Sequence, residues 1–469
     1  MGGERQAIKG QDLKDELLVS LERLGEFSAR FTTNDLSGSA VAASGRVLLD
    51  GLVTILAGGR LEESARLRRA FPLSGGSASI FGDRRTAGVV DAAWLNGVSM
   101  VSLELDEGNK YIRGHASAHV LPACLALAEA KEASGPEFMN AFLVGHEIAS
   151  RFGSAVHLHL GVHPHGNWGV AGAAAACARL SGGDPLQISK AIDNAGAFAI
   201  AAPFSAATAG MMVRNGWIGT ANAAGVWASA IALSDREGPL VGICRESLGG
   251  LLGILDVAKL TEGIGSNFFV ESGYFKRHAS CSYTHPPADA AIEIFNRKGP
   301  VSPDMVSSIA VETHHLAAGL NSLVWPTRMA AMFSIPFVVA TALEAGNCGP
   351  DQFGEDSRSS QRRIALASKV RVADDAGIDS RLPDFRACRL RIEWSDGTQS
   401  VLEVDNPVGD ADNQPFDEDR LFEKAVMLFG NGIAERVFQI AHDLPACPNV
   451  SNLTAGLREI ACAGLDGKP

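Results

Sequence analysis

Residues 104–129 read ELDEGNKYIRGHASAHVLPACLALAE, a polar segment followed by an apolar one. The apolar half places leucine, alanine and cysteine on most faces of a helix, which predicts a buried helix. The polar half concentrates acids, a lysine, a tyrosine and a histidine in one loop. Loops on a rigid scaffold often carry functional residues, although many charged loops are only solvated. The stretch therefore predicts a buried helix beside a polar loop. That loop either lines a functional site or is a solvated part of the surface.

The remainder of the first 268 residues also favours helices. Leu17, Leu21 and Leu24 recur at spacings of three and four, which is typical of an amphipathic helix. Further helices are predicted at residues 42–57, 64–70, 88–103, 118–133, 136–160, 168–181, 185–200, 205–212 and 216–234. The uncharged run 194–213 approaches the length of a membrane span, but its glycine, alanine, asparagine and proline favour a buried helix pair in a large all-helical core.

The pattern changes after residue 268. Alternating apolar stretches at 307–313, 369–372, 387–394 and 399–404 predict strands, and Asp396-Gly397 predicts a hairpin between the last two. Helices are predicted among them at 286–296 and 328–345, with a mobile loop at 346–364. A helical pattern returns at 417–441. We therefore expect a mainly α protein: a large all-helical domain built from both chain ends (residues 1–268 and 409–469) plus a smaller α+β lid (269–408).

Composition restricts the partners. The chain has 469 residues, a formal net charge of −12 and no run rich in lysine and arginine, which argues against nucleic acid and leaves a small anionic substrate open. The eight cysteines form no CxxC pair, which indicates reduced thiols. The polar N-terminus lacks the apolar core of a signal peptide. We expect a cytoplasmic protein that does not insert into a membrane.

Four histidines crowd the segment AVHLHLGVHPHGNW at residues 155–168. Their spacing fits no recognised metal motif and no carboxylate lies among them, so we predict no metal site. His115 and His119 lie four apart, but Ala116 stands where a zinc protease has its glutamate. Gly161, Pro164 and Gly166 predict a turn before a helix that starts near residue 168. A histidine there would have its pKa lowered by the helix dipole and would serve as a neutral base.

Two further segments carry groups suited to an anionic substrate. Arg214 follows the uncharged run and either reaches solvent or binds a carboxylate in a buried pocket. Residues 276–285, KRHASCSYTH, lie at the expected domain boundary, where ligands often bind. Cys281 and His285 have only their four-residue spacing to suggest a nucleophile pair. The sequence has no GxGxxG after a strand, no P-loop and no GxSxG motif, so proton-transfer chemistry remains.

Several motifs, taken together and in order, resemble the MmgE/PrpD family. They are the acidic segment 104–107 with the 115–129 helix, HPHGNWG at 163–169, residues 212–219, FKR at 275–277 with TH at 284–285, and MFSIPF at 332–337. The family includes 2-methylcitrate dehydratase, cis-aconitate decarboxylase and iminodisuccinate epimerase. The resemblance implies a helical domain with an α+β lid, a homodimer, an active site between the domains, and no metal or organic cofactor.

The resemblance also assigns positions. His115 and His163 match active-site histidines of the decarboxylase branch. Glu104 stands where that branch has aspartate, Arg214 where it has lysine, and Cys281 where it has another histidine. A longer acid, a permanently charged cation and a thiol would redistribute the acid and base roles, which argues against decarboxylation of cis-aconitate.

We therefore expect a cofactor-independent lyase that abstracts a proton next to a carboxylate of a small di- or tricarboxylate, in the manner of a dehydratase. The alternatives are an epimerase that returns the proton to the other face and a binding protein with altered catalysis. Predicted catalytic residues are His115 or His163 as base, Glu104 or Tyr283 as the returning acid, and Cys281. Predicted substrate-binding residues are Arg214, Lys276, Lys110, Tyr111 (also a candidate acid), Asn109 and His285. His115, His163 and Arg214 should face one cavity.

Overall fold

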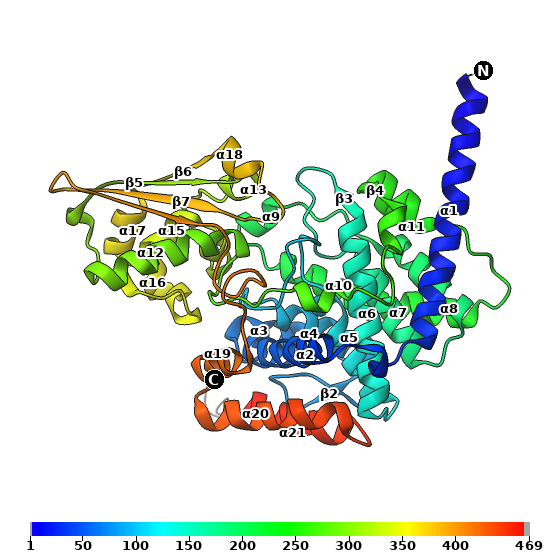
Figure 1. The fold of residues 1–469 in the computed structure, drawn as a ribbon. Helices are drawn as coiled ribbons and strands as arrows, with labels where there is room; N and C mark the ends of the chain where they lie inside the picture. The colour runs from blue at the N-terminus through cyan, green and yellow to red at the C-terminus, as the bar shows by residue number, and fades with distance from the viewer. Residues whose placement is uncertain (1, 464–469) are drawn as a thin grey trace.

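The computed structural model describes the backbone of residues 2–463 and the side chains of residues 16–463, and it places a large helical domain beside a smaller α+β domain (Figure 1). The first part of the chain forms α1 Gly2–Arg30, α2 Gly38–Gly59, α3 Glu62–Ala70, α4 Val89–Met100, α5 Ala116–Ala130, α6 Gly135–Ala155, α7 Val170–Leu180, α8 Pro185–Asn194, α9 Ser205–Thr208, α10 Val213–Ser234 and α11 Ile243–Glu246. Two short antiparallel pairs join it: β1 Ala78–Ser79 with β2 Thr86–Ala87, and β3 Val156–Leu158 with β4 Gly253–Leu255. The predicted fold class is confirmed.

Small residues let the central helices pack closely. A Cβ added to Gly97 of α4 would lie 3.0 Å from Gly219 Cα of α10, and one added to Gly172 of α7 would lie 2.3 Å from Gly145 O of α6. Larger side chains at these positions would force the helices apart, because the distance between helix axes follows the side chains at the contact. The glycine and alanine content of this region therefore produces the dense core that supports the site.

The C-terminal helices complete the same domain. Helices α19 Glu418–Phe429, α20 Asn431–Asp443 and α21 Ser451–Cys462 pack along α2 (Figure 1). Lys424 Nζ donates to Asp50 Oδ1 at 2.5 Å, and Arg60 Nη1 donates to the Ile460 carbonyl at 3.2 Å. Apolar side chains of these helices belong to the hydrophobic cluster that also contains α2, α5, α6 and α7. The return of the chain to its first domain is thus observed, while the limits at residues 268 and 408 stay predictions.

The α+β domain has a second hydrophobic core. It contains α12 His285–Lys298, β5 Val306–Thr313, α13 His315–Ala318, α14 Arg328–Met332, α15 Ile335–Ala345, α16 Glu355–Ser359, α17 Gln361–Ala367, β6 Val370–Asp374, α18 Ala376–Asp379, β7 Cys388–Trp394 and β8 Gln399–Val404. The sheet order is β6-β5-β7-β8, with β5 and β6 parallel and the other pairs antiparallel. Helices α12, α15 and α17 lie along one face of the sheet (Figure 1). All four predicted strands and the Asp396-Gly397 hairpin are confirmed.

Three local predictions are wrong. The helix expected at 136–160 ends at Ala155, because the next residues pair with β4. The run 194–213 is not a buried helix pair: it forms a 3-10 turn, an extended stretch and α9, and α9 stops before Gly210, whose φ is +74°. The loop expected at 346–364 instead contains a 3-10 turn, α16 and the start of α17.

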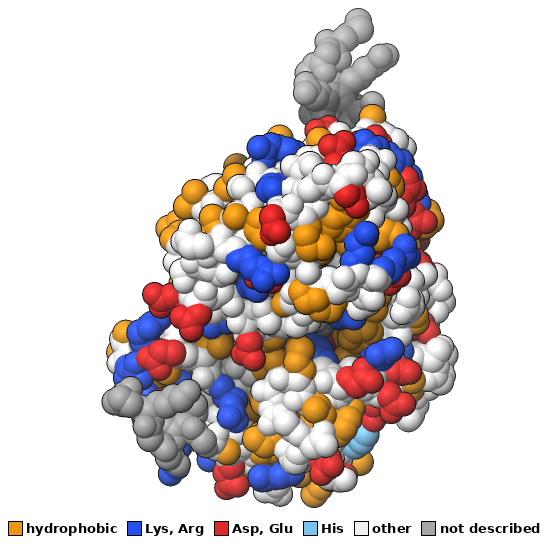
Figure 2. Space-filling view, turned by 90° about the vertical axis from the view of Figure 1, so that its left-hand side faces the viewer, with side chains coloured by type: hydrophobic (Ala, Val, Ile, Leu, Met, Phe, Trp, Pro, Cys, Tyr) orange, Lys and Arg blue, Asp and Glu red, His pale blue; other side chains and the backbone are white. Residues whose placement is uncertain are grey.

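One helix among the described residues, α2, is long and apolar enough to cross a membrane, but 78% of its most apolar window is buried inside the protein. It is a core helix that other helices surround, and it packs against α4 and the C-terminal helices. On the face shown in Figure 2, acidic and basic side chains are interspersed with apolar ones, and no stripe of one charge crosses that face.

Candidate active site

The loop between α4 and α5 is buried and held from several sides. Gly108 N donates to the Tyr274 carbonyl at 3.0 Å, and Tyr274 N donates back to Gly108 at 2.7 Å. Lys424 Nζ donates to the Leu105 carbonyl at 2.5 Å. Glu104 adopts a left-handed backbone with φ +52°, a conformation that costs a non-glycine residue about 1–3 kcal/mol and that clusters at functional sites. The carboxylates of this loop are at most 2% exposed, so it is not a solvated surface.

Four charged side chains from three segments meet at this loop. The Glu104 carboxylate contacts Arg214 Nη1 through one oxygen and Lys276 Nζ, at 3.3 Å, through the other. Lys276 Nζ also lies 3.4 Å from Asp106 Oδ1. Burial disfavours the Lys276 ammonium, but the Asp106 and Glu104 carboxylates outweigh burial and raise its pKa, so it stays charged. Two positive and two negative charges therefore balance, while the buried Arg214 Nε has no partner among the described residues.

His115 precedes α5 and is a neutral base. Its Nδ1 lies 2.7 Å from the Glu107 carbonyl oxygen, which can only accept, so Nδ1 carries the proton and Nε2 keeps a lone pair. Asp106 Oδ2, 3.1 Å from the same Nδ1, favours the same tautomer. Burial, followed by the Lys276 charge, lowers the pKa of His115 to about 3. The ring is therefore neutral at pH 7, with its one proton on Nδ1, and at 8% exposure it is among the most accessible groups of the cluster.

His163 has the opposite tautomer. The backbone N–H of His165 donates to His163 Nδ1 at 3.1 Å, so the neutral ring carries its proton on Nε2. Burial lowers its pKa well below the usual value, and the Arg214 charge adds to this. The prediction of a neutral histidine is met here, but its predicted cause, the dipole of the following helix, is wrong, because α7 begins only at Val170. His163 thus offers a donor where His115 offers an acceptor.

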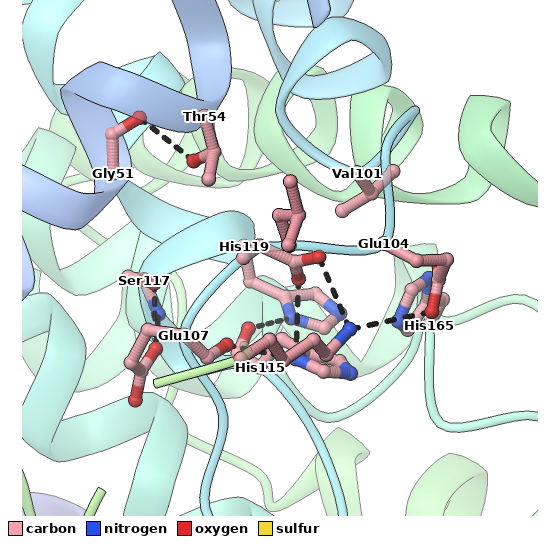
Figure 3. Close-up of polar contacts among 12 residues, drawn as sticks. Gly51, Thr54, Val101, Glu104, Glu107, His115, Ser117, His119 and His165 are labelled. Atoms are coloured by element: carbon pink, nitrogen blue, oxygen red, sulfur yellow. Dashed lines mark hydrogen bonds and ion pairs between the residues drawn. The ribbon is translucent and has the colours of Figure 1, made fainter. Parts of the chain in front are cut away.

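His165 and His119 complete the cluster. The His165 ring lies edge-on to three other histidines, with centroids 4.4 Å from His163, 5.4 Å from His115 and 5.8 Å from His119. It is fully buried, and neither of its nitrogens has a partner among the described residues. His119 Nδ1 donates to the His115 carbonyl at 2.8 Å, and its Nε2 accepts from Gly166 N at 3.3 Å, so it ties the two loops together. Figure 3 shows His115, His119 and His165 close to Glu104.

Asp106 and His165 were missed as site residues by sequence reasoning. Both lay inside segments that the sequence pattern had marked, the acidic loop and the histidine run. Nothing in the sequence separated them from their neighbours, because the distinction depends on which side chain faces which. In the structure, both residues are recognised by their burial, because each is 0% exposed.

The segment 276–285 brings Cys281 to the cluster from the α+β side. Burial, followed by the Glu104 charge, raises the pKa of the Cys281 thiol to about 11, so it is protonated at neutral pH. His285 Nε2 lies 3.2 Å from the Ser280 carbonyl and its ring 4.9 Å from that of His278. The proposed Cys281–His285 nucleophile pair is therefore not formed. Tyr283 packs edge-on against His314 at 5.0 Å, and burial raises the pKa of its phenol.

Three predicted binding residues lie outside the cluster. The Lys110 ammonium is already occupied by Asp410 at 3.1 Å, by Asp412 and by a backbone carbonyl. Tyr111 is 38% exposed, and the Lys110 ammonium lies 5.4 Å from its ring centroid. The Asn109 side chain bonds within the loop framework, donating to Ser272 Oγ at 2.9 Å. These contacts stabilise the loop and already engage the Lys110 ammonium and the Asn109 amide.

Within the described residues, no three histidine, cysteine or carboxylate side chains are arranged to hold a metal ion. The His165 ring lies edge-on to its neighbours, and the Nδ1 atoms of His115 and His163 bond to different backbone groups.

Two family models match the chain: the MmgE/PrpD N-terminal domain over residues 22–256 and the MmgE/PrpD C-terminal domain over residues 278–444. The chain belongs to the MmgE/PrpD family. A cis-aconitate decarboxylase from Aspergillus terreus (strain NIH 2624 / FGSC A1156) is 25% identical over 93% of this chain and 94% of its own. A cis-aconitate decarboxylase-like protein, oryM, from Aspergillus oryzae (strain ATCC 42149 / RIB 40) is 30% identical over 34% of this chain and 36% of its own.

Both MmgE/PrpD domains contribute to the cluster. The N-terminal match contains the acidic loop, the histidines and Arg214, and the C-terminal match contains Cys281 and Tyr283. Lys276 lies in the short segment between the two matches and pairs with carboxylates of the first. The site therefore depends on how the two domains meet.

Proposed function

We propose that this protein is a cofactor-independent lyase that acts on a small tri- or dicarboxylate by removing a proton next to a carboxylate. The observation that carries the proposal is the pair of neutral histidines with opposite tautomers, His115 with a free lone pair and His163 with an N–H, beside the buried cations Arg214 and Lys276. The decarboxylase relatives, which match nearly the whole chain, support a polycarboxylate substrate and a lyase reaction.

His115 takes the proton in this reaction. Its Nε2 lone pair accepts the proton from the carbon, and the electron pair of the broken C–H bond moves onto the adjacent carboxylate as enolate-like charge. In the free protein the low pKa of His115 makes it a weak base. A bound carboxylate beside Lys276 and Arg214 offsets the positive charge that contributes to this low value. Substrate binding therefore raises the pKa of His115 and strengthens the base.

The remaining groups stabilise the charge that develops. His163 Nε2–H and the unpartnered Arg214 Nε are fixed donors in a site without bulk water, where such donors act strongly on an oxyanion. The N–H of a neutral imidazole is very weakly acidic. It therefore suits hydrogen-bond donation to the developing charge better than it suits proton transfer. The enolate pair then forms a carbon–carbon double bond as the neighbouring C–O bond breaks, and protonated His115 returns its proton to the departing hydroxide as water.

A second candidate is decarboxylation, which the names of the relatives favour. There the C–C bond to a carboxylate breaks, CO₂ leaves with its oxygens, and the electron pair remaining on carbon must take a proton. His115 is neutral in the free protein and cannot supply that proton, so a donor such as the Lys276 ammonium or the Cys281 thiol would have to do so. The low pKa of His115 therefore suits this residue to proton abstraction rather than proton donation.

The test uses the metal-stripped full-length protein with 2-methylcitrate, citrate and cis-aconitate in D₂O, followed by NMR. A new alkene supports dehydration, CO₂ release supports decarboxylation, and deuterium incorporation with an intact skeleton supports epimerase-type chemistry. We expect His115→Gln to lower turnover about 10²- to 10⁴-fold. His315→Gln, an exposed histidine paired with Asp379 on the lid, is the matched control and should retain activity. Wild-type turnover in both His115→Gln and His163→Gln would overturn the proposal.

A further inference from the structure

A second group of buried polar side chains lies at the end of the α+β sheet. His314 follows the last residue of β5, and Arg386 stands two residues before β7. The antiparallel register pairs Thr313 with Cys388, so the fold brings these two residues to the same end of the sheet. No local motif joins them in the sequence. Their proximity is a consequence of strand pairing.

Both side chains have polar atoms without partners. His314 is fully buried, and neither ring nitrogen has a hydrogen-bond partner among the described residues. Arg386 is 3% exposed; its Nη2 donates to Asp410 Oδ2 at 2.9 Å, but its Nε has no partner. A buried donor or acceptor without a partner costs about 1–3 kcal/mol, so such a group in a native protein needs an explanation, and a bound ligand is one.

These residues adjoin the histidine cluster through two tyrosines. The Arg386 guanidinium lies 4.2 Å from the centroid of the Tyr274 ring. A Cβ added to Gly108 would lie 2.5 Å from Tyr274 Oη and 3.0 Å from His115 Nδ1, so the phenol and His115 are close neighbours. On the other side, the His314 ring packs edge-on against Tyr283. The two unpartnered groups thus lie on the lid side of the proposed reaction centre.

We propose that His314 and Arg386 form a subsite that binds the central carboxylate of a tricarboxylate substrate, on the lid side and away from Arg214. The proposal rests on the proposed function, because it assumes a polycarboxylate held beside His115. Arg386 Nε and one N–H of the His314 ring donate to the carboxylate oxygens. A substrate that lacks this carboxylate leaves both donors unpaired, so the subsite selects for the number and spacing of carboxylates.

The balance of charges around the site favours selection of the substrate by hydrogen bonding rather than by charge. Arg214 and Lys276 face Glu104 and Asp106, and Arg386 and Lys110 face Asp410 and Asp412. Neither group of four side chains has a net positive charge, so overall charge contributes little to the binding free energy of an anion. A site that hydrogen-bonds a substrate group rejects analogues without that group far better than an apolar pocket rejects a smaller substrate. The structure therefore implies strong preference for a tricarboxylate over the matching dicarboxylate.

The experiment is calorimetric titration of the full-length protein with propane-1,2,3-tricarboxylate and with glutarate, which lacks only the central carboxylate. Wild type should bind the tricarboxylate more tightly. His314→Phe removes both nitrogens, and Arg386→Lys keeps a cation for Asp410 but removes Nε. Each variant should weaken tricarboxylate binding about 10- to 100-fold and glutarate binding by less than about twofold. His315→Phe, the exposed neighbour, is the matched control.

Equal affinity of wild type for the two ligands, or unchanged preference in both variants, would overturn the subsite and leave the proposed function standing. Failure of wild type to bind or turn over any polycarboxylate would overturn the proposed function itself. A crystal structure of the wild-type complex with propane-1,2,3-tricarboxylate decides the matter if a variant does not fold. A carboxylate within hydrogen-bond distance of His314 or Arg386 Nε supports the subsite, and its absence there contradicts it.

Discussion

His115 and His163 carry their ring protons on opposite nitrogens and lie against the same third ring, His165. The Glu107 carbonyl fixes the proton of His115 on Nδ1, and the backbone N–H of His165 leaves the proton of His163 on Nε2. Both assignments follow from backbone groups, which cannot change their roles as donor or acceptor. The loop conformations therefore determine which histidine accepts a proton and which donates a hydrogen bond.

The pH dependence of turnover should differ between the free and the substrate-bound protein. In the free protein the pKa of His115 is about 3, so kcat/KM should show no acid limb from this residue between about pH 5 and 8. Bound carboxylates raise that pKa, so kcat should fall on the acid side at a higher pH than kcat/KM. Steady-state rates, corrected for the separately measured titration of the substrate, provide the test. A shared acid limb near pH 6.5 in both parameters would contradict the role of His115.

Stability should fall as the pH is lowered below about 6.5. His115, His119, His163 and His165 have folded-state pKa values below the ordinary 6.5, chiefly because of burial. Between the folded and unfolded values, the unfolded chain binds more protons, so the free energy of unfolding rises with pH by up to about 1.4 kcal/mol per pH unit for each histidine. Urea unfolding from pH 7.5 to 5 measures this slope.

His119→Asn is the informative variant for that slope, because His119 ties the two loops but is not assigned to the reaction. Its removal should flatten the pH dependence, whereas His315→Asn, an exposed histidine, should leave it unchanged. A slope that does not respond to loss of His119 would show that its protonation does not oppose folding.

Lys424 should position the acidic loop from a distance. It donates to Asp50 and to the Leu105 carbonyl, between Glu104 and Asp106. Lys424→Met leaves the buried Asp50 carboxyl without its partner, which should cost about 3–5 kcal/mol and raise KM. Burial already raises the pKa of Asp50 to about 6 despite Lys424, so Asp50→Asn in the same chain should recover part of the stability. Denaturant unfolding of the two variants, with the exposed Arg420→Met as control, measures the loss of stability and its recovery, and steady-state kinetics measure KM.

Cys281 should be unreactive. Its thiol is buried, and its pKa of about 11 leaves almost no thiolate at pH 8. Iodoacetamide should therefore modify Cys281 in the folded protein far more slowly than after unfolding, as measured by peptide mass spectrometry. Cys281→Ser should still turn over substrate. A covalent adduct between Cys281 and substrate would overturn this assignment.

Periodicity in the sequence was sufficient for the two-domain pattern and for all four strands of the large sheet. It failed where a partner far along the chain decides the structure, as when residues 156–158 pair with 253–255 instead of extending α6. The same cause explains Lys110: its charge looked available to a substrate until the fold brought Asp410 and Asp412 to it. His314 and Arg386 carried no sequence signal, because only the register of β5 with β7 brings them together.

The tautomers of His115 and His163 can be measured directly by ¹⁵N NMR of the histidine rings in the ligand-free protein at pH 7, with His115→Gln and His163→Gln identifying the two signals. The predicted result is two neutral rings, His115 protonated on Nδ1 and His163 protonated on Nε2. The same tautomer for both rings, or an imidazolium at either position, would contradict the assignment of base and donor.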